Sequence, residues 1–316
     1  MSQPTLHSVH INRPLTMISV AYVQNLKLYV ADKVFPVIPV DNQSDLYWTF
    51  NKNDWLRDEA KPRAPATESV GSGYGVATDS YAAIPYAIHK DVPDQIRNNA
   101  DAALDLDRSA VQFVTNRILL RQEIQWASDF FTTGKWATDV TPANLWSDYA
   151  ASDPIADVET GKRAILAVTG YMPNVLVLGY DVYIKLINHP DIVDRFKYTN
   201  SQSVTKEMLA QVFGLERVEI AQSIYATNNE GETAAYSFVH GKNALLAYVA
   251  ARPSVMEPSA GYTFAWKGVS GSYGQTVGVK QFRMEHLAAT RVEAEVAFAN
   301  KIVASDLGYF FSGAVA

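Results

Sequence analysis

Three short patterns in the sequence contain residue types that can bind phosphate or metal. Gly71-Ser72-Gly73-Tyr74-Gly75 has the close glycines of a nucleotide loop, but it lacks the third glycine at the required spacing and opens no helix. The glycine-rich segment 268–278 contains no Gly-Lys-Ser/Thr, so it cannot place a lysine on phosphates. His7 and His10 form an isolated His-x-x-His pair, whereas zinc needs three or four ligands. We therefore predict no cofactor and no metal site.

Nucleophilic catalysis has equally little support. The chain has no cysteine, which removes thiolate nucleophiles and zinc–thiolate sites together. No G-x-S-x-G elbow is present, although the members of a Ser/His/Asp triad meet only in the fold and sequence spacing alone does not reveal them. We interpret His189, which precedes a proline, and His286, which we place in a strand, as structural or surface residues. The expected protein is not an enzyme and has no catalytic residue, with a soluble hydrolase as a remaining alternative.

Composition indicates a globular protein that associates. The chain has 316 residues, of which 48% are hydrophobic and 19% charged, so core material is ample. The formal net charge is −6 and no Lys/Arg cluster stands out, which argues against a dedicated nucleic-acid reader but not against enclosing nucleic acid. The 17 Tyr and 6 Trp favour interfaces, where large area and a polar group are useful together. No signal peptide and no run of 18 apolar residues is visible, so we expect no membrane partner and assembly in a cytoplasm.

The most informative element is a long helical pattern that follows a short aromatic strand. No Gly or Pro interrupts Asp94 to Phe131, and a helix of that length would span roughly 60 Å. Asp91 can cap it and Pro93 fits its first turn. The apolar positions drift around the helix instead of keeping a heptad, which argues against a coiled coil and suits a helix lying along a sheet. The expected buried stripe begins with Ile96, Ala100, Ala103, Leu104, Val111, Val114 and Ile118. Two ordinary helices with an unmarked break remain the alternative.

A long β-hairpin is expected before this helix, over residues 46–90. Its outgoing strand is aromatic, with Tyr47, Trp48 and Phe50, and its returning strand runs from Tyr81 to His89. The intervening segment is too long for a structureless loop inside a compact domain, so we interpret it as a projecting functional loop, with a solvated loop as the alternative. The candidate intersubunit contacts are the charged residues in its first half: Arg57, Asp58, Glu59, Lys61 and Arg63.

The remaining segments predict an α+β chain. Residues 1–45 read as an extended arm, punctuated by prolines and with a short helix from Ile18 to Leu28, that needs a partner surface. Asp153-Pro154 predicts a helix start, Gly170 its end, and 175–178 a buried strand. Further short helices and strands follow to about residue 276. Near the C-terminus, the alternation of Val292, Ala294, Val296 and Phe298 with polar residues predicts a strand with one buried face.

This order of elements resembles the major capsid proteins of tailed bacteriophages, with their Hong Kong 97-type fold. The resemblance runs from about Asp45 onward. It rests on the charged hairpin, on YAAIPYAIHKDVPDQ entering the long helix, on MPNVLVLGYDVYIKLINHPDIVDRF, and on the C-terminal RVEAEVAFANKIVASDLGYFFSGAV. These are diffuse patterns, so the order of the elements contributes more than any single residue.

The resemblance implies an α+β capsid fold with a definite division of the chain. Residues 1–45 would form an N-terminal arm that wraps neighbours, and 46–90 an extended hairpin, the E-loop, lying across an adjacent subunit. Residues 91–153, completed by 277–300, would form a peripheral domain with a spine helix. Residues 154–276 would form an axial domain around the five- and six-fold axes, which 301–316 rejoin.

The implied function is a major capsid protein in the virion. It would assemble as hexamers and pentamers into an icosahedral head that encloses double-stranded DNA without reading its sequence, alongside a portal and separate scaffolding or cement proteins. An encapsulin-like shell around an enzyme cargo is the alternative with the same fold. Some family members cross-link a loop lysine to an asparagine, but no motif joins Lys52 or Lys61 to Asn300, so we do not extend that chemistry to this chain.

Overall fold

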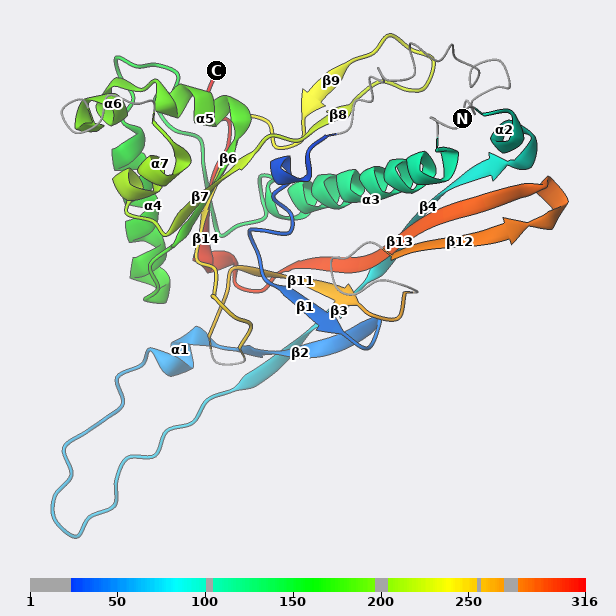
Figure 1. Ribbon diagram of the computed structural model, residues 1–316. Helices are drawn as coiled ribbons and strands as arrows, with labels where there is room; N and C mark the ends of the chain where they lie inside the picture. The colour runs from blue at the N-terminus through cyan, green and yellow to red at the C-terminus, as the bar shows by residue number, and fades with distance from the viewer. Residues whose placement is uncertain (1–23, 101–104, 197–203, 255–256, 270–277) are drawn as a thin grey trace.

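The computed structural model describes residues 24–100, 105–196, 204–254, 257–269 and 278–316. Two β-sheets, each covered by helices, lie side by side, and a hairpin projects from the first of them (Figure 1). No helix among the described residues is long and apolar enough to cross a membrane. Residues 1–23 of the predicted arm, with most of the helix predicted at Ile18–Leu28, fall outside the described residues. Of that helix, the described residues contain a 3₁₀ turn, η2 (Leu26–Leu28).

The first sheet is built around its longest strand. Its five strands are β1 (Val37–Val40), β4 (Ile84–Pro93), β11 (Gly261–Trp266), β12 (Gly278–Met284) and β13 (Ala289–Ile302). β13 pairs antiparallel with β4, β11 and β12, and β1 joins β11 in parallel. The predicted alternation is confirmed, because Val292, Ala294, Val296 and Phe298 are all buried on one face.

Helix α3 (Leu106–Phe130) covers that face, and a shorter helix, α2 (Asp94–Asn99), precedes it. The predicted uninterrupted helix is therefore wrong, and the two-helix alternative is right. Ala100 has extended backbone angles (φ −75°, ψ 139°), and the Asp105 side chain caps a new start by accepting from the Arg108 N–H. Asp91 caps neither helix, because Arg291 holds its carboxylate.

The drift of the apolar stripe along α3 has a clear structural cause. Ala110, Val114 and Ile118 pack on the first sheet, whereas Trp126 and Phe130 enter the core of the second unit. One helix thus belongs to two cores, and no single heptad serves both. Val111, expected in the stripe, is exposed on the outer side of the helix.

The second sheet forms the larger core. Its strands are β5 (Thr138–Val140), β14 (Gly308–Phe311), β10 (Ala244–Ala247), β6 (Val175–Gly179) and β7 (Arg217–Ala221), in that order. Every residue of β6, β10 and β14 is buried. Four helices pack around it: α4 (Pro154–Thr169), α5 (Tyr180–Ile187), α6 (Pro190–Phe196) and α7 (Lys206–Phe213). As predicted, Asp153 caps α4, Pro154 opens it and Gly170 closes it in a left-handed conformation.

Smaller elements complete the described structure. They are α1 (Lys52–Trp55), the two-stranded pair β8 (Ile224–Ala226) and β9 (Tyr236–Phe238), and the 3₁₀ turns η3 (Glu285–Leu287) and η4 (Ser305–Leu307). His286 lies exposed in η3, not in the strand we expected. β11 belongs to the first sheet, so the expected division near residue 276 does not coincide with the division between the sheets.

Two expectations about the N-terminal third are wrong. The hairpin's returning strand is β3 (Val76–Ala82), paired with β2 (Ser44–Phe50), whereas β4 has already left the hairpin to pair with β13. The end of the presumed arm needs no partner, because Val30, Val34 and Phe35 are buried in the chain's own core. The Phe35 ring lies 4.5 Å from that of Phe130, so aromatic packing anchors this segment.

Candidate functional site

The hairpin β2–β3 is held firmly at its base. The Tyr81 ring stacks on Phe264 of β11 with centroids 4.5 Å apart, and Tyr47 stacks on the same ring at 5.5 Å. Ala83 and Gln43 close the base through two hydrogen bonds, one from the Ala83 N–H (2.7 Å) and one from the Gln43 side chain (3.1 Å). The hairpin is thus a fixed extension of the first sheet.

Beyond its base the hairpin exposes an apolar face. Strand geometry puts Leu46, Trp48 and Phe50 on one side of β2, and the register places Val76 opposite Phe50. Leu46 and Trp48 are each 64% exposed. Large apolar side chains grouped in this way mark an interaction surface. We call Leu46, Trp48, Phe50 and Val76 the ribbon face.

An aromatic cluster continues the ribbon face toward the projecting loop. The Trp55 ring lies 5.2 Å from Tyr74 and 6.2 Å from Phe50, joining the two sides of the loop. The Asp54 carboxylate accepts from the Gly75 N–H at 3.0 Å, which closes the loop at its neck. Lys52 forms an ion pair with Asp306 and ties the neck to η4.

A groove lies between the hairpin and the body of the subunit. Its volume is about 630 Å³, and its walls come from Trp48, Phe50 and Trp55 on one side and from Tyr171, Pro253 and Tyr262 on the other. The lining is mainly aromatic and apolar, which suits another polypeptide better than a phosphorylated or metal-bound ligand.

The five charged candidates belong to the segment between α1 and β3, which forms the projecting loop in Figure 1. Arg57 pairs with Glu59 at 3.1 Å, and a hydrogen bond from Ser72, with Arg57 second, lowers the pKa of Glu59. Arg63 donates to the Thr67 carbonyl. Asp58 and Lys61 are exposed. Whether these residues contact a neighbouring subunit stays a prediction.

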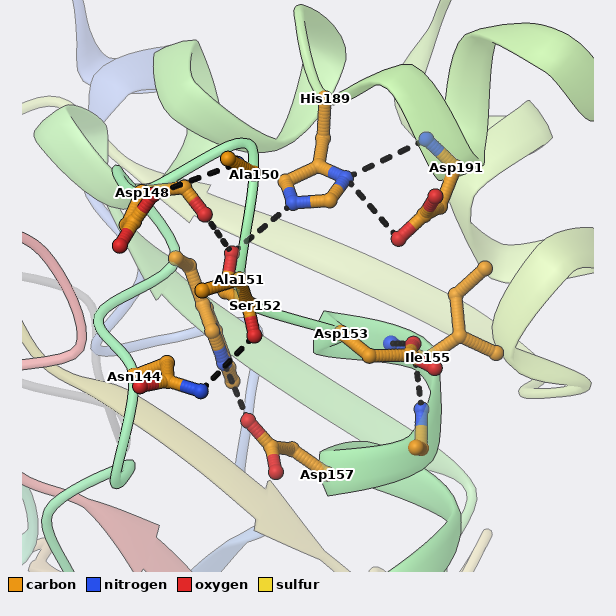
Figure 2. Close-up of polar contacts among 12 residues, drawn as sticks. Asn144, Asp148, Ala150, Ala151, Ser152, Asp153, Ile155, Asp157, His189 and Asp191 are labelled. Carbon is orange, nitrogen blue, oxygen red and sulfur yellow. Dashed lines mark hydrogen bonds and ion pairs between the residues drawn. The ribbon is translucent and has the colours of Figure 1, made fainter.

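A serine, a histidine and an aspartate do come together elsewhere, where the loop before α4 meets the start of α6 (Figure 2). Ser152 Oγ lies 3.0 Å from His189 Nε2, and His189 Nδ1 lies 3.6 Å from Asp191 Oδ2. These are the residue types of a hydrolytic triad, and only the fold brings Ser152 to His189.

The hydrogen-bond pattern of this trio is nevertheless not that of a triad. His189 Nδ1 accepts from the Asp191 N–H at 3.3 Å, so the neutral ring carries its proton on Nε2. Ser152 Oγ donates to the Asp148 carbonyl at 2.6 Å and therefore accepts from Nε2, the reverse of a base-activated serine. His189 is fully buried and Ser152 is 7% exposed. The trio braces a loop against α6.

The other chemical candidates remain isolated. A Cβ built on Gly71 or Gly73 meets nothing within 4 Å, so close packing does not require glycine at either position. His7 and His10, and most of 268–278, lie outside the described residues. Among the described residues, no group of three or more His, Asp or Glu side chains could hold a metal ion. Asn300 already bonds Asp129 and Thr263 within the chain.

The two-unit architecture, with its shared spine helix and projecting hairpin, is the Hong Kong 97-type capsid fold. The chain is 26% identical over 313 residues to the major capsid protein of Burkholderia phage BcepMu, with 95% of each chain covered. It is 23% identical to the major capsid protein of Pseudomonas phage JBD67, with 97% of each covered. No family model matches the chain.

Solved structures agree with this assignment. A phage-related protein from Bordetella bronchiseptica RB50 superposes with a TM-score of 0.70 at 25% identity, covering 92% of this chain and 94% of that one. The capsid of cyanophage P-SCSP1u has the same fold at 11% identity, with a TM-score of 0.62 and coverage of 95% and 91%. The chain is therefore similar to phage major capsid proteins over nearly its whole length, and it has their fold.

Sequence reasoning found the hairpin but missed its most exposed feature. The aromatic richness of β2 is evident in the sequence, but our prediction assigns the intersubunit contacts to the charged loop. The signal for the ribbon face was the spacing of Leu46, Trp48 and Phe50 at every second residue, which places all three on one side of a strand.

Proposed function

We propose that the chain assembles as hexamers and pentamers into an icosahedral head that encloses double-stranded DNA. The second sheet and α4–α7 form the axial domain near the symmetry axes. The first sheet, α2 and α3 form the peripheral domain, and the hairpin lies across an adjacent subunit. Assembly takes place in the host cytoplasm with a portal and with separate scaffolding or cement proteins, and the protein performs no catalysis.

The observation that carries this proposal is the ribbon face. An isolated subunit gains nothing from holding Leu46 and Trp48 in water on a two-stranded ribbon that projects from the body. When a neighbouring subunit covers these side chains, each Å² of apolar surface removed from water contributes roughly 25 cal/mol to the free energy of association. The charged loop beyond adds little affinity, about 0–1 kcal/mol per exposed ion pair, but it orients the partner and disfavours wrong registers.

Closure of the shell turns these modest contacts into a stable particle. Each subunit meets several neighbours, so one lost contact does not release it while the others hold. The mechanism is geometric: a flat subunit with a fixed lateral extension tiles a surface.

Sedimentation of variants tests the role of the loop. Reversing charge with Arg57→Glu and Arg63→Glu should slow or abolish the conversion of subunits into large particles while circular dichroism stays unchanged. The matched control is Arg57→Lys with Arg63→Lys, which keeps the charge and should assemble. Undisturbed assembly of the Glu variant would show that the loop is not an important contact.

A further inference from the structure

A strip of alternating cations and aromatic rings runs along the edge where α3 meets β4. The Lys90 Nζ atom and the Arg117 guanidinium each lie 5.2 Å from the centre of the Phe113 ring. One helical turn further, the Arg121 guanidinium lies 5.1 Å from the centre of the Tyr86 ring. Phe113, Arg117 and Arg121 follow one another at four-residue steps and so share one side of the helix. We call these five residues the basic strip.

The cations of the basic strip have no carboxylate partner among the described residues. Arg121 donates only to the neutral side chain of Gln125, at 2.7 Å. On the same sheet, by contrast, Lys280 pairs with Glu295 and Arg291 with Asp91. Within a chain of net charge −6, three cations placed together with no carboxylate partner in the described parts of the chain indicate an anionic partner from outside.

Helix α3, which contains Phe113, Arg117 and Arg121, and the hairpin lie on opposite sides of the first sheet (Figure 1). At every second residue from Val292 to Phe298, the side chain points toward α3. Ala299 and Val303, further along the chain, instead pack with Tyr81 and Phe264 under the hairpin. A shell has two faces. The face opposite the projecting hairpin can therefore point toward the interior of the shell.

The chemistry of the strip favours phosphate over a neighbour's carboxylates. Each guanidinium lies over an aromatic ring, Arg117 over Phe113 and Arg121 over Tyr86. Arg117 and Arg121 lie one turn apart, about 6 Å, in a row that can follow a strand of phosphates. The projecting loop of another subunit does not complement this charge, since residues 51–75 contain four basic and four acidic side chains.

We propose that the basic strip contacts the phosphate backbone of packaged double-stranded DNA; this inference rests on the proposed function. Three cations neutralise at most three phosphates per subunit, so a single subunit binds weakly and independently of sequence. Many copies on one inner surface hold the outer DNA layer without fixing it, and added salt releases it.

Binding of a 30-base-pair duplex to the purified, full-length subunit, measured by fluorescence anisotropy across a salt series, tests the proposal. For three contacts the slope of log K against log [salt] should be near −2.7, and Arg117→Gln with Arg121→Gln should reduce its magnitude by about 1.8. Arg117→Lys with Arg121→Lys keeps the charge and should keep the slope. Lys61→Gln with Arg63→Gln, in the projecting loop, should leave it unchanged.

Equal slopes for the wild type and the Gln variant would overturn the proposal. So would a folded Gln variant that binds DNA normally but no longer assembles, since the strip would then be a contact between subunits. The readout is separate from shell formation: a protein that never forms shells but shows Arg-dependent DNA binding would contradict the proposed function and leave the strip's affinity for phosphates standing.

Discussion

The backbone N–H of Val30 donates to the buried carboxylate of Glu123, at 3.1 Å from each oxygen. The same carboxylate accepts from the Ala31 N–H at 2.9 Å and from the Ser223 hydroxyl at 3.2 Å. One side chain of α3 therefore ties together the N-terminal segment and the connection between β7 and β8. Removing it would leave buried donors without partners.

A histidine beside this carboxylate sets the pH behaviour of the core. His240 Nε2 lies 3.6 Å from Glu123 Oε1, and both side chains are fully buried. Burial raises the pKa of Glu123 to about 7, against hydrogen bonds from Ala31 and Val30, and burial lowers the pKa of His240 to about 3. Glu123 in turn raises the pKa of Tyr29, after burial as the larger cause.

The two shifts act on stability in opposite directions. Between pH 4.5 and 7 the folded protein keeps a proton on Glu123 that the unfolded chain releases, so this group's contribution falls as pH rises. Between pH 3 and 6.5 the unfolded chain binds a proton at His240 that the folded protein lacks, so that contribution rises with pH. From pH 4.5 to 6.5 the two contributions change the unfolding free energy by equal amounts in opposite directions, so they cancel.

In the Glu123→Gln variant, the part of the pH dependence of the unfolding free energy that comes from His240 should remain without the opposing part from Glu123. Relative to the wild type, the variant should gain about 1.4 kcal/mol of unfolding free energy per pH unit between pH 4.5 and 6.5. Urea unfolding of both proteins across that range measures the difference, from which all other titrating groups cancel. Parallel pH profiles would show that the pair does not titrate as described.

Gly179 sits where a side chain has no room. A Cβ at this position would lie 2.1 Å from the backbone carbonyl oxygen of Gly241, which cannot rotate away. Gly179→Ala should therefore lower the unfolding free energy by about 3 kcal/mol. Gly71→Ala, in open space, is the control and should change it by less than about 0.5 kcal/mol. Similar unfolding midpoints for the two variants would contradict the close approach of β6 to the β9–β10 turn.

Asp91 and Arg291 link β4 to β13 through a bidentate pair, with N–O distances of 2.7 and 2.9 Å. Hydrogen bonds from Arg291 hold the pKa of Asp91 below its ordinary value, so the stabilisation is present above about pH 4 and disappears as pH falls through the folded-state pKa. Asp91→Asn should cost about 1 kcal/mol at pH 7 and much less near pH 2. If urea unfolding shows that the loss of unfolding free energy does not change with pH, the loss comes from packing and not from the ion pair.

Ser152 should be inert as a nucleophile. A fluorophosphonate probe should fail to label the native protein. The Ser152 hydroxyl proton is already donated to the backbone carbonyl of Asp148, and the His189 ring that would accept it is buried. Ser152→Ala should instead lower the unfolding free energy by about 1 kcal/mol. Stoichiometric labelling of Ser152 in the folded protein would revive the hydrolase alternative.

Local signals predicted much of the fold. A cap followed by proline located the start of α4 at Asp153, Gly170 located its end, and strict alternation located β13 with its buried face. In each case the determining interaction lies within a few residues of the element, so the sequence pattern contains it.

The errors arose where partners distant in the chain decide the outcome. At Ala83 the chain stops pairing with β2 and begins pairing with β13, a strand some 200 residues away. The burial of Phe35 likewise depends on distant residues, Phe130 and Trp136. The meeting of Ser152 with His189, and of Glu123 with His240, has no local signature at all. The charged candidates of the loop remain a prediction, made because they crowd into residues 57–63, whereas the ribbon face depends on β2 being uncovered on one side.

Electron microscopy of the expressed protein tests the central claim most directly. Purified protein, with its scaffolding partner where one is needed, should give hexamers, pentamers or closed shells. In a reconstruction of such shells, each hairpin should lie on a neighbouring subunit with Leu46 and Trp48 covered. A protein that stays monomeric under every assembly condition, or shells whose hairpins remain in solvent, would contradict it.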